Sequence, residues 1–200
     1  MTSAADDIVS LYRRHARAWA RARGGQLCEG EWLDRFHALL PSRATVLDIG
    51  CGTGQPIAHH LTEQGCIVTG VDSSPEMIAM AKDRQPAGDW LIADMRTLSL
   101  SRTFDGLLAW DSFFHLGYDD QRRMFAVFRR HANAGAALMF TSGPSYGEAI
   151  GRLEGEPLFH ASLDGAEYRT LLDAHGFAVV AHAVEDPECG GHTIWLARLR

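Results

Sequence analysis

The chain has 200 residues, 46% hydrophobic and 22% charged, which is enough to bury one substantial core and too few for two ordinary domains. Its formal net charge of -6 gives no basic surface to attract nucleic acid phosphates, so we expect a small-molecule partner and no nucleic acid. The opening MTSAADDIVS has no basic or apolar leader, and no apolar run approaches the roughly 18 residues that span a bilayer, so we expect a cytoplasmic protein without a membrane partner.

Two amphipathic helix patterns come first, over Asp6–Arg23 and Glu31–Leu40. We expect residues 1–42 to form a helical lid region across the ends of the strands that follow. In the first helix Tyr12, His15 and Trp19 are spaced by three and four residues, so they share one face. That face is a candidate to cover a ligand, and plain packing is the alternative.

Short apolar runs then alternate with helical patterns over residues 43–142, the expected cofactor-binding core. The predicted strands are Thr45–Ile49, Cys66–Val71, Trp90–Ala93, Phe104–Trp110 and Ala137–Thr141, and the predicted helices are Pro56–Gln64, Pro75–Asp83 and Asp119–Ala132. Continuous apolar strands are typical of a sheet with helices on both faces. The alternation predicts an α/β fold with a parallel sheet and a ligand at the carboxyl ends of the strands.

The remainder completes a single domain over residues 1–200. Residues 143–165 form a polar, glycine-bearing segment that we interpret as a long substrate-side loop, since long ordered loops are often functional. Residues 166–200 predict a helix capped by Asp164 and two strands, Phe177–Val184 and His192–Leu199. Because EDPECGG is short enough for a hairpin, the last strand should run antiparallel.

The four cysteines show no C-x-x-C spacing, and two of them fall in predicted core elements. This pattern favours reduced thiols over a disulfide framework. Cys189 and His192 have no third or fourth ligand near them in sequence, so we expect no metal site.

The segment VLDIGCGTGQP, residues 46–56, places three alternate glycines directly behind Asp48. Its GxGxG spacing differs from the GxGxxG fingerprint of dinucleotide-binding loops, because Gln55 stands where the third glycine of that fingerprint would be. No lysine of a Walker A motif follows either. A carboxylate about 6 Å from a diphosphate would cost roughly 3 kcal/mol at an effective dielectric constant near 20, and would favour an ammonium group by a similar amount. Asp48 therefore favours a cationic ligand.

Two further acids follow predicted strands. Asp72 ends the second strand, 22 residues beyond Gly50, where its carboxylate can accept hydrogen bonds from two adjacent ribose hydroxyls. The third strand ends in Ala-Asp-Met, which places Asp94 to accept from an adenine amino group and Met95 to pack against the ring. A solvated loop acid is the alternative for Asp94.

Four segments, VLDIGCGTG, GVDSSPEM, the ADM after the third strand and FDGLLAWDSFFHL, resemble the successive motifs of class I S-adenosylmethionine-dependent methyltransferases in order and spacing over roughly residues 44–142. The resemblance implies a Rossmann-like seven-stranded sheet, mostly parallel with an antiparallel last strand, and S-adenosylmethionine (SAM) as cofactor. The cofactor-binding residues that it implies are Asp48, Gly50, Cys51, Gly52, Gly54, Asp72, Ser73, Met77, Asp94, Met95, Trp110 and Asp111. We add Tyr12 from the lid helix to this predicted set.

Specific contacts follow from the same resemblance. Asp48 and the glycine loop would surround the methionine part of the cofactor. If the first helix covers the cofactor, its Tyr12 would lie near the cofactor carboxylate. Asp72 would bind the ribose, Met77 would border the adenosine, and Asp94 and Met95 would meet the adenine. Trp110 and Asp111 would border the sulfonium and the amino group.

A sulfonium methyl group is already a strong electrophile, so the protein must mainly align an acceptor lone pair and exclude water. His115 follows the strand end that faces the methyl group and is our candidate base, with a structural histidine as the alternative. Phe114, Tyr146 and His160, together with Glu148, are candidates to contact the acceptor, against core packing for Phe114 and ordinary exposure for the others.

We therefore expect a methyltransferase that acts on an O, N or S nucleophile of a small molecule. A non-catalytic SAM-binding or interaction module, a methyltransferase acting on protein, and an NAD-dependent oxidoreductase are the alternatives. Gln55 and Asp48 disfavour the last.

Overall fold

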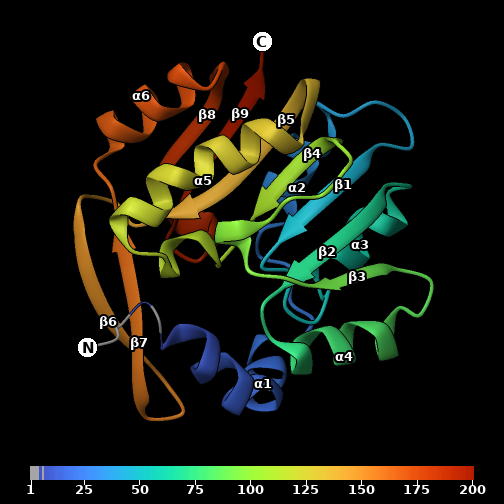
Figure 1. The fold of residues 1–200 in the computed structure, drawn as a ribbon, viewed down its shortest axis with the longest axis vertical. Helices are drawn as coiled ribbons and strands as arrows, with labels where there is room; N and C mark the ends of the chain where they lie inside the picture. The colour runs from blue at the N-terminus through green and yellow to red at the C-terminus, as the bar shows by residue number, and fades with distance from the viewer. Residues whose placement is uncertain (1–4, 6) are drawn as a thin grey trace.

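The computed structural model describes Ala5 and residues 7–200 and is built around one seven-stranded sheet (Figure 1). The strand order is β3-β2-β1-β4-β5-β9-β8. The strands are β1 (Thr45–Ile49), β2 (Ile67–Asp72), β3 (Asp89–Ile92), β4 (Phe104–Ala109), β5 (Ala132–Ser142), β8 (Phe177–Asp186) and β9 (His192–Leu199). Strands β1 to β5 pair in parallel, whereas β9 is antiparallel to both β5 and β8. The predicted fold class and the antiparallel last strand are confirmed.

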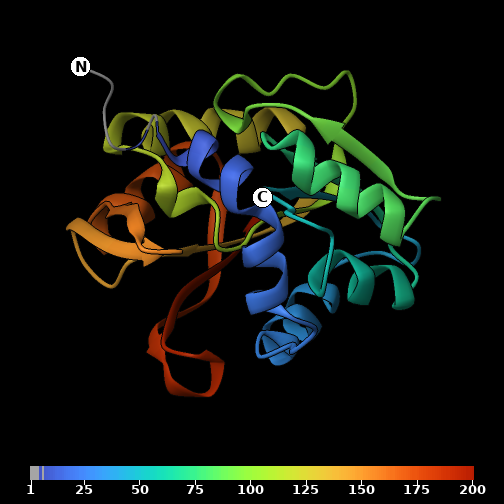
Figure 2. The ribbon, with the colours of Figure 1, turned by 90° about the horizontal axis from the view of Figure 1, so that it is seen from below.

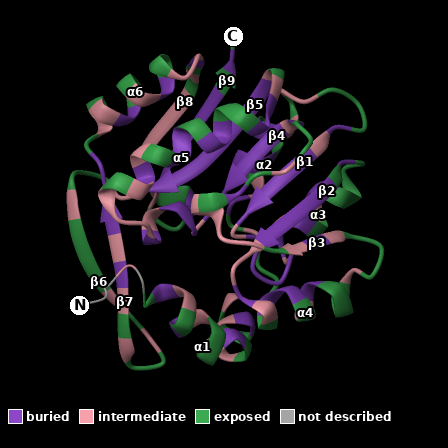
Figure 3. Ribbon diagram, in the orientation of Figure 1, coloured by how far each residue is buried: buried purple, intermediate pink, exposed green. Residues whose placement is uncertain are grey.

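Helices cover both faces of the sheet. They are α1 (Ile8–Arg23), α2 (Gly30–His37), α3 (Ile57–Glu63), α4 (Pro75–Arg84), α5 (Tyr118–His131) and α6 (Gly165–Ala174), with short 3-10 turns η1 (Met95–Thr97), η2 (Phe113–His115) and η3 (Pro187–Cys189). Side chains of α5 and α6 form one core layer with the sheet, and those of α2, α3 and α4 form the other. The central strands are buried, as Figure 3 shows. No helix among the described residues is both long and apolar enough to cross a membrane.

Local sequence signals explain where these helices begin and end. The Ser74 side chain accepts a hydrogen bond from the Met77 amide at the start of α4, with Pro75 at the first helical position. Asp164 caps α6 in the same way through the Ala166 amide, and Gly176 follows the helix with φ +83°. The predicted start of the first helix, Asp6, lies outside the described residues.

The loop predicted over residues 143–165 is wrong, because most of it is a β-hairpin. Strands β6 (Gly147–Leu153) and β7 (Glu156–Ser162) pair antiparallel around a two-residue turn in which Glu154 and Gly155 both have positive φ. Most of β6 is exposed, so its sequence shows no apolar alternation. The hairpin instead packs Phe159 and neighbouring residues against α1, a partner that is remote in sequence.

Helix α1 and this hairpin stand at the carboxyl ends of the parallel strands, where α1 also contacts α4 (Figure 1). Viewed from below in Figure 2, α1 lies in front of the centre of the sheet. Its Ile8 and Leu11 pack on the hairpin, and the Arg13 guanidinium lies 3.5 Å from the Glu76 carboxylate of α4. The helix thus bridges the two sides of the strand ends.

Candidate active site

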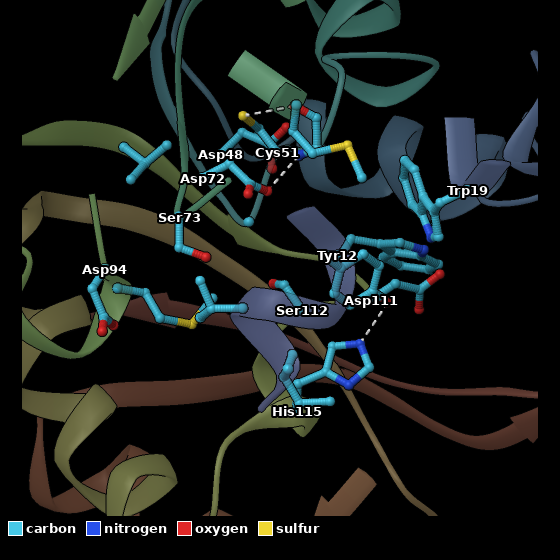
Figure 4. A pocket seen from close by; sticks show the side chains of 18 of the residues that line it. Tyr12, Trp19, Asp48, Cys51, Asp72, Ser73, Asp94, Asp111, Ser112 and His115 are labelled. Carbon is cyan, nitrogen blue, oxygen red and sulfur yellow. Dashed lines mark hydrogen bonds between the residues drawn. The ribbon is translucent and has the colours of Figure 1, made fainter. Parts of the chain in front are cut away.

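A cleft opens where the strand order reverses, between the carboxyl ends of β1 and β4, and Tyr12 and Trp19 of α1 lie on one side of it (Figure 4). This is the position at which open α/β sheets bind ligands. The cleft encloses about 1050 Å³ of space, part of which is open to solvent. All of the predicted cofactor-binding residues except Gly54 line it, as does His115. Its walls come from helix α1, the segment 48–57, and the residues at and just beyond the carboxyl ends of β2, β3 and β4.

Asp48 is the most unusual residue of the cleft. It is 3% exposed, and its carboxylate accepts no hydrogen bond from any described residue. Burial, followed by the nearby charge of Asp72, raises the pKa of Asp48 to about 7. A buried carboxylate without partners is costly, and a nearby cation would stabilise its ionised form.

Asp72 is anchored to the backbone on both of its oxygens. It accepts hydrogen bonds from the Gly52 amide at 3.0 Å and from the Ser74 amide at 2.8 Å. Burial raises the pKa of Asp72, and the Ser74, Gly52 and Ser73 amides oppose that rise. Each oxygen keeps a second lone pair, which leaves the geometry suited to a pair of vicinal hydroxyls.

The glycine loop is shaped by close contacts as much as by its backbone. Gly50 has φ +79°, and a Cβ there would lie 2.2 Å from the Ser112 Cβ; Gly52 has φ +55°, and a Cβ there would lie 3.1 Å from the Trp19 ring. Trp19 of α1 therefore sits directly over the loop. Gly54 does not line the cleft; its carbonyl accepts from the Gln85 side chain at 3.3 Å.

At the end of the cleft beyond strand β3, Asp94 forms an ion pair with Arg96. The Arg96 side chain donates to both carboxylate oxygens, and the Arg96 amide donates to one of them at 2.9 Å. Although burial opposes the change, these hydrogen bonds lower the pKa of Asp94. Asp94 thus has less free acceptor capacity for an adenine amino group than the sequence suggests.

His115, on η2, has both ring nitrogens engaged. Its Nδ1 lies 2.8 Å from the Phe159 carbonyl oxygen, which can only accept, so Nδ1 carries the proton. Its Nε2 then accepts from the Tyr12 hydroxyl at 2.9 Å. Burial lowers the pKa of His115 to about 4, and the residue is neutral at physiological pH. Through these two hydrogen bonds, His115 connects helix α1 to strand β7 of the hairpin.

Sequence reasoning missed a second histidine. The Nε2 atom of His192, at the start of β9, lies 3.0 Å from an Asp111 carboxylate oxygen, and its Nδ1 lies 2.6 Å from the Cys189 carbonyl oxygen. The hydrogen bond that His192 makes to the Asp111 carboxylate raises the pKa of His192, although burial opposes that rise. Only the β8–β9 hairpin register places it here. Nearby, the buried Trp110 Nε1 has no hydrogen-bond partner among the described residues.

A second pocket of about 780 Å³ lies beside the cleft and contains the four predicted acceptor residues, Phe114, Tyr146, Glu148 and His160. Two of the rings contact other aromatic rings: Tyr146 stacks on Tyr118 with ring centroids 4.8 Å apart, and the His160 ring centroid lies 4.9 Å from that of Phe114. The His160 ring is also 5.0 Å from that of His115. These two histidines form the wall between the cleft and the second pocket.

Within the described residues, no group of three or more His, Cys, Asp or Glu side chains is placed to hold a metal ion. The four cysteines are free thiols, and Cys28 alone among them is exposed. The cleft is therefore characterised by carboxylates, aromatic rings and backbone amides.

Comparison with known proteins identifies the class that this strand order and cleft define. A family described as a methyltransferase domain matches residues 46–135. A malonyl-acyl-carrier-protein O-methyltransferase of Enterobacter lignolyticus is 35% identical over 112 residues, which are 54% of this chain and 43% of that protein. A magnesium-protoporphyrin O-methyltransferase of Rhodobacter capsulatus is 30% identical over 151 residues, 66% of each. Residues 46–135 thus match a methyltransferase domain, and the chain spans less than half the length of the first of these relatives.

Solved structures share the fold at low identity. The Burkholderia thailandensis 1,6-didemethyltoxoflavin N1-methyltransferase, solved with its substrate and S-adenosylhomocysteine, aligns with a TM-score of 0.75 at 21% identity and covers 100% of this chain and 92% of its own. The sugar N-methyltransferase KedS8 from Streptoalloteichus gives 0.74 at 21%, with 92% of each chain covered.

Proposed function

We propose that this chain transfers the methyl group of SAM to an O, N or S nucleophile of a small molecule. The observation that carries the proposal is the unpartnered, buried carboxylate of Asp48 behind the glycine loop. A diphosphate at that position would be repelled, whereas the amino group of SAM would be attracted. Asp72 and Asp111 line the same cleft; Asp94 also lines it, and Arg96 balances its charge there.

The lining fits the rest of that cofactor as well. Asp72 would hold the ribose hydroxyls, Met77 and Met95 would pack on the adenosine, and Asp48 and Asp111 would face the amino group. The unpartnered Trp110 N–H is a donor at the amino-acid end. When bound there, SAM supplies an activated methyl group, and no further activation of that group is needed.

The remaining chemistry belongs to the protein. Helix α1 excludes water and keeps the cofactor in place, with Trp19 over the loop and Tyr12 over the middle of the cleft. The predicted role of His115 as base requires that Nε2 first release the Tyr12 hydroxyl. We propose instead that His115 positions the Tyr12 side chain and, through Tyr12, helix α1.

The acidic composition supports a small-molecule acceptor over nucleic acid, and free thiols support a reducing compartment such as the cytoplasm. Both inferences are part of the proposal, as is the acceptor site in the second pocket.

Calorimetry with SAM, S-adenosylhomocysteine and NAD tests the proposal. We expect SAM to bind, NAD not to bind, and Asp72→Ala to lose tight SAM binding with an unchanged circular dichroism spectrum. Incubation of the protein with SAM and a cell extract should then release S-adenosylhomocysteine. Tight NAD binding, or SAM affinity unaltered in Asp72→Ala, would contradict the assignment.

A further inference from the structure

The second pocket has a distinctive charge. Its lining contains aromatic rings, small residues and serines, and among the described residues that line it Glu148 is the only Asp, Glu, Lys or Arg. A carboxylate or phosphate on an acceptor would meet no cation there and would be opposed by Glu148. The pocket therefore suits an acceptor that is neutral or positively charged and has an apolar body to pack on Phe114 and Tyr146.

His160 differs from His115 in one respect that matters for proton transfer. Both nitrogens of His115 are engaged, by Tyr12 and by the Phe159 carbonyl, whereas His160 makes no hydrogen bond to any described residue. His160 is half-buried, lines the second pocket, and touches the wall of the cofactor cleft through His115. Burial lowers its pKa, so its ring is neutral at physiological pH and has a free lone pair.

We propose that the acceptor is an uncharged or cationic molecule bearing an N–H or O–H nucleophile on an apolar body, that it binds in the second pocket, and that His160 takes the proton from that nucleophile. This inference rests on the proposed function. It moves the role of base from His115 to a residue that is 45 positions further along the chain but belongs to the same wall.

The proposed step balances in protons and electrons. The nucleophile's proton passes to a ring nitrogen of His160, and the lone pair that remains on the acceptor nitrogen or oxygen forms the new bond to the methyl carbon. The carbon–sulfur bond breaks with its electrons going to sulfur, which leaves a neutral thioether. His160 then returns its proton to water, because the second pocket opens to solvent.

A binding experiment tests the acceptor class without relying on turnover. The protein is labelled with 13C-histidine, saturated with S-adenosylhomocysteine, and titrated with three probes of one shape: 2-phenylethylamine, 4-ethylphenol and 3-phenylpropionate. The His160 signal is assigned from its loss in His160→Gln. We expect the amine or the phenol to shift that signal and the carboxylate not to shift it.

Two outcomes overturn the inference: the carboxylate shifts the His160 signal as strongly as the others, or neither the amine nor the phenol shifts it. If S-adenosylhomocysteine itself does not bind, the proposed function fails first, so the two failures are distinguishable.

Kinetics with the acceptor found by product mass spectrometry provide the second arm. Because a positioned general base contributes about 100-fold or more, His160→Gln should lower kcat by at least that factor and leave KM for the acceptor within about threefold. His59→Gln, an exposed histidine of α3, is the matched control and should retain wild-type kcat. A His160→Gln enzyme with kcat within twofold of wild type would remove His160 from the reaction.

Discussion

Binding of SAM should release protons from the protein, and Asp48 should be their source. The pKa of Asp48 in the free protein is about 7, so the group is about half protonated at pH 7. A cation about 5 Å away, at an effective dielectric constant near 20, stabilises the carboxylate by about 3 kcal/mol and lowers its pKa by about 2 units. Bound SAM would therefore leave Asp48 largely ionised.

The size of the release depends on pH in a defined way. With a pKa of about 7 in the free protein and about 5 in the complex, about half a proton leaves at pH 7, about 0.8 at pH 6 and about 0.1 at pH 8. Calorimetric titrations in phosphate and in Tris measure this number, because the observed enthalpy depends on the ionisation enthalpy of the buffer in proportion to the protons released.

Two controls isolate the cause. Asp48→Asn should release almost no proton at any of these pH values, and at pH 8 should bind SAM about 100-fold more weakly, the equivalent of about 3 kcal/mol. S-adenosylhomocysteine keeps the amino group and should behave like SAM, whereas 5′-methylthioadenosine has no amino-acid part and should release none. Equal proton release with 5′-methylthioadenosine, or an unchanged release in Asp48→Asn, would refute the reasoning.

Four further predictions concern the frame of the site. Gly50→Ala should lower the free energy of unfolding by about 2–4 kcal/mol in urea denaturation, because φ is +79° at this position and the new Cβ would overlap Ser112. Gly25→Ala is the control: its Cβ would meet nothing within 4 Å, so the free energy of unfolding should change by less than about 1 kcal/mol. Tyr12→Phe leaves the buried His115 Nε2 without its donor and should cost about 1–3 kcal/mol in the same assay; no loss would contradict the hydrogen bond. Glu156→Gln weakens the contacts that Arg14 and His15 of α1 make with it at 2.5 and 2.6 Å. Because the Glu156 carboxylate is solvent-accessible, global stability should hardly change, while limited proteolysis within α1 should accelerate; unchanged cleavage would argue against a role of Glu156 in tethering α1. Folding lowers the pKa of His115 from 6.5 to about 4, so the neutral imidazole stabilises the fold at high pH, and that contribution is lost as the pH falls from 6.5 to 4. Between pH 7 and pH 4 the free energy of unfolding of the wild type should therefore fall by about 3 kcal/mol more than that of His115→Phe. Parallel curves of unfolding free energy against pH would disprove the shift.

The gathering of the predicted cofactor residues in one cleft follows from the sequence because each motif is local. A strand, a turn and a helix start occupy consecutive residues at Asp48, Asp72 and Asp94, and the parallel sheet brings their carboxyl ends to one edge without any information from elsewhere in the chain. The capping of α4 by Ser74 follows from the same local chemistry.

The rest depends on partners that are distant in sequence. Strands β6 and β7 look like loop because their apolar side chains face α1, more than 130 residues earlier. His192 reaches Asp111 only through the register of the β8–β9 hairpin, and Gly54 packs on Trp90 and does not line the cleft. The hydrogen bonds that occupy His115 likewise come from α1 and β7, so its free nitrogen could not be judged from WDSFFHL alone.

A crystal structure of the protein with S-adenosylhomocysteine tests the central claim most directly. We expect the amino group of the ligand beside Asp48 and its ribose hydroxyls on Asp72, beneath Tyr12 and Trp19. A ligand absent from this cleft at saturating concentration, or NAD seated with its diphosphate against the glycine loop in parallel crystals, would contradict the account.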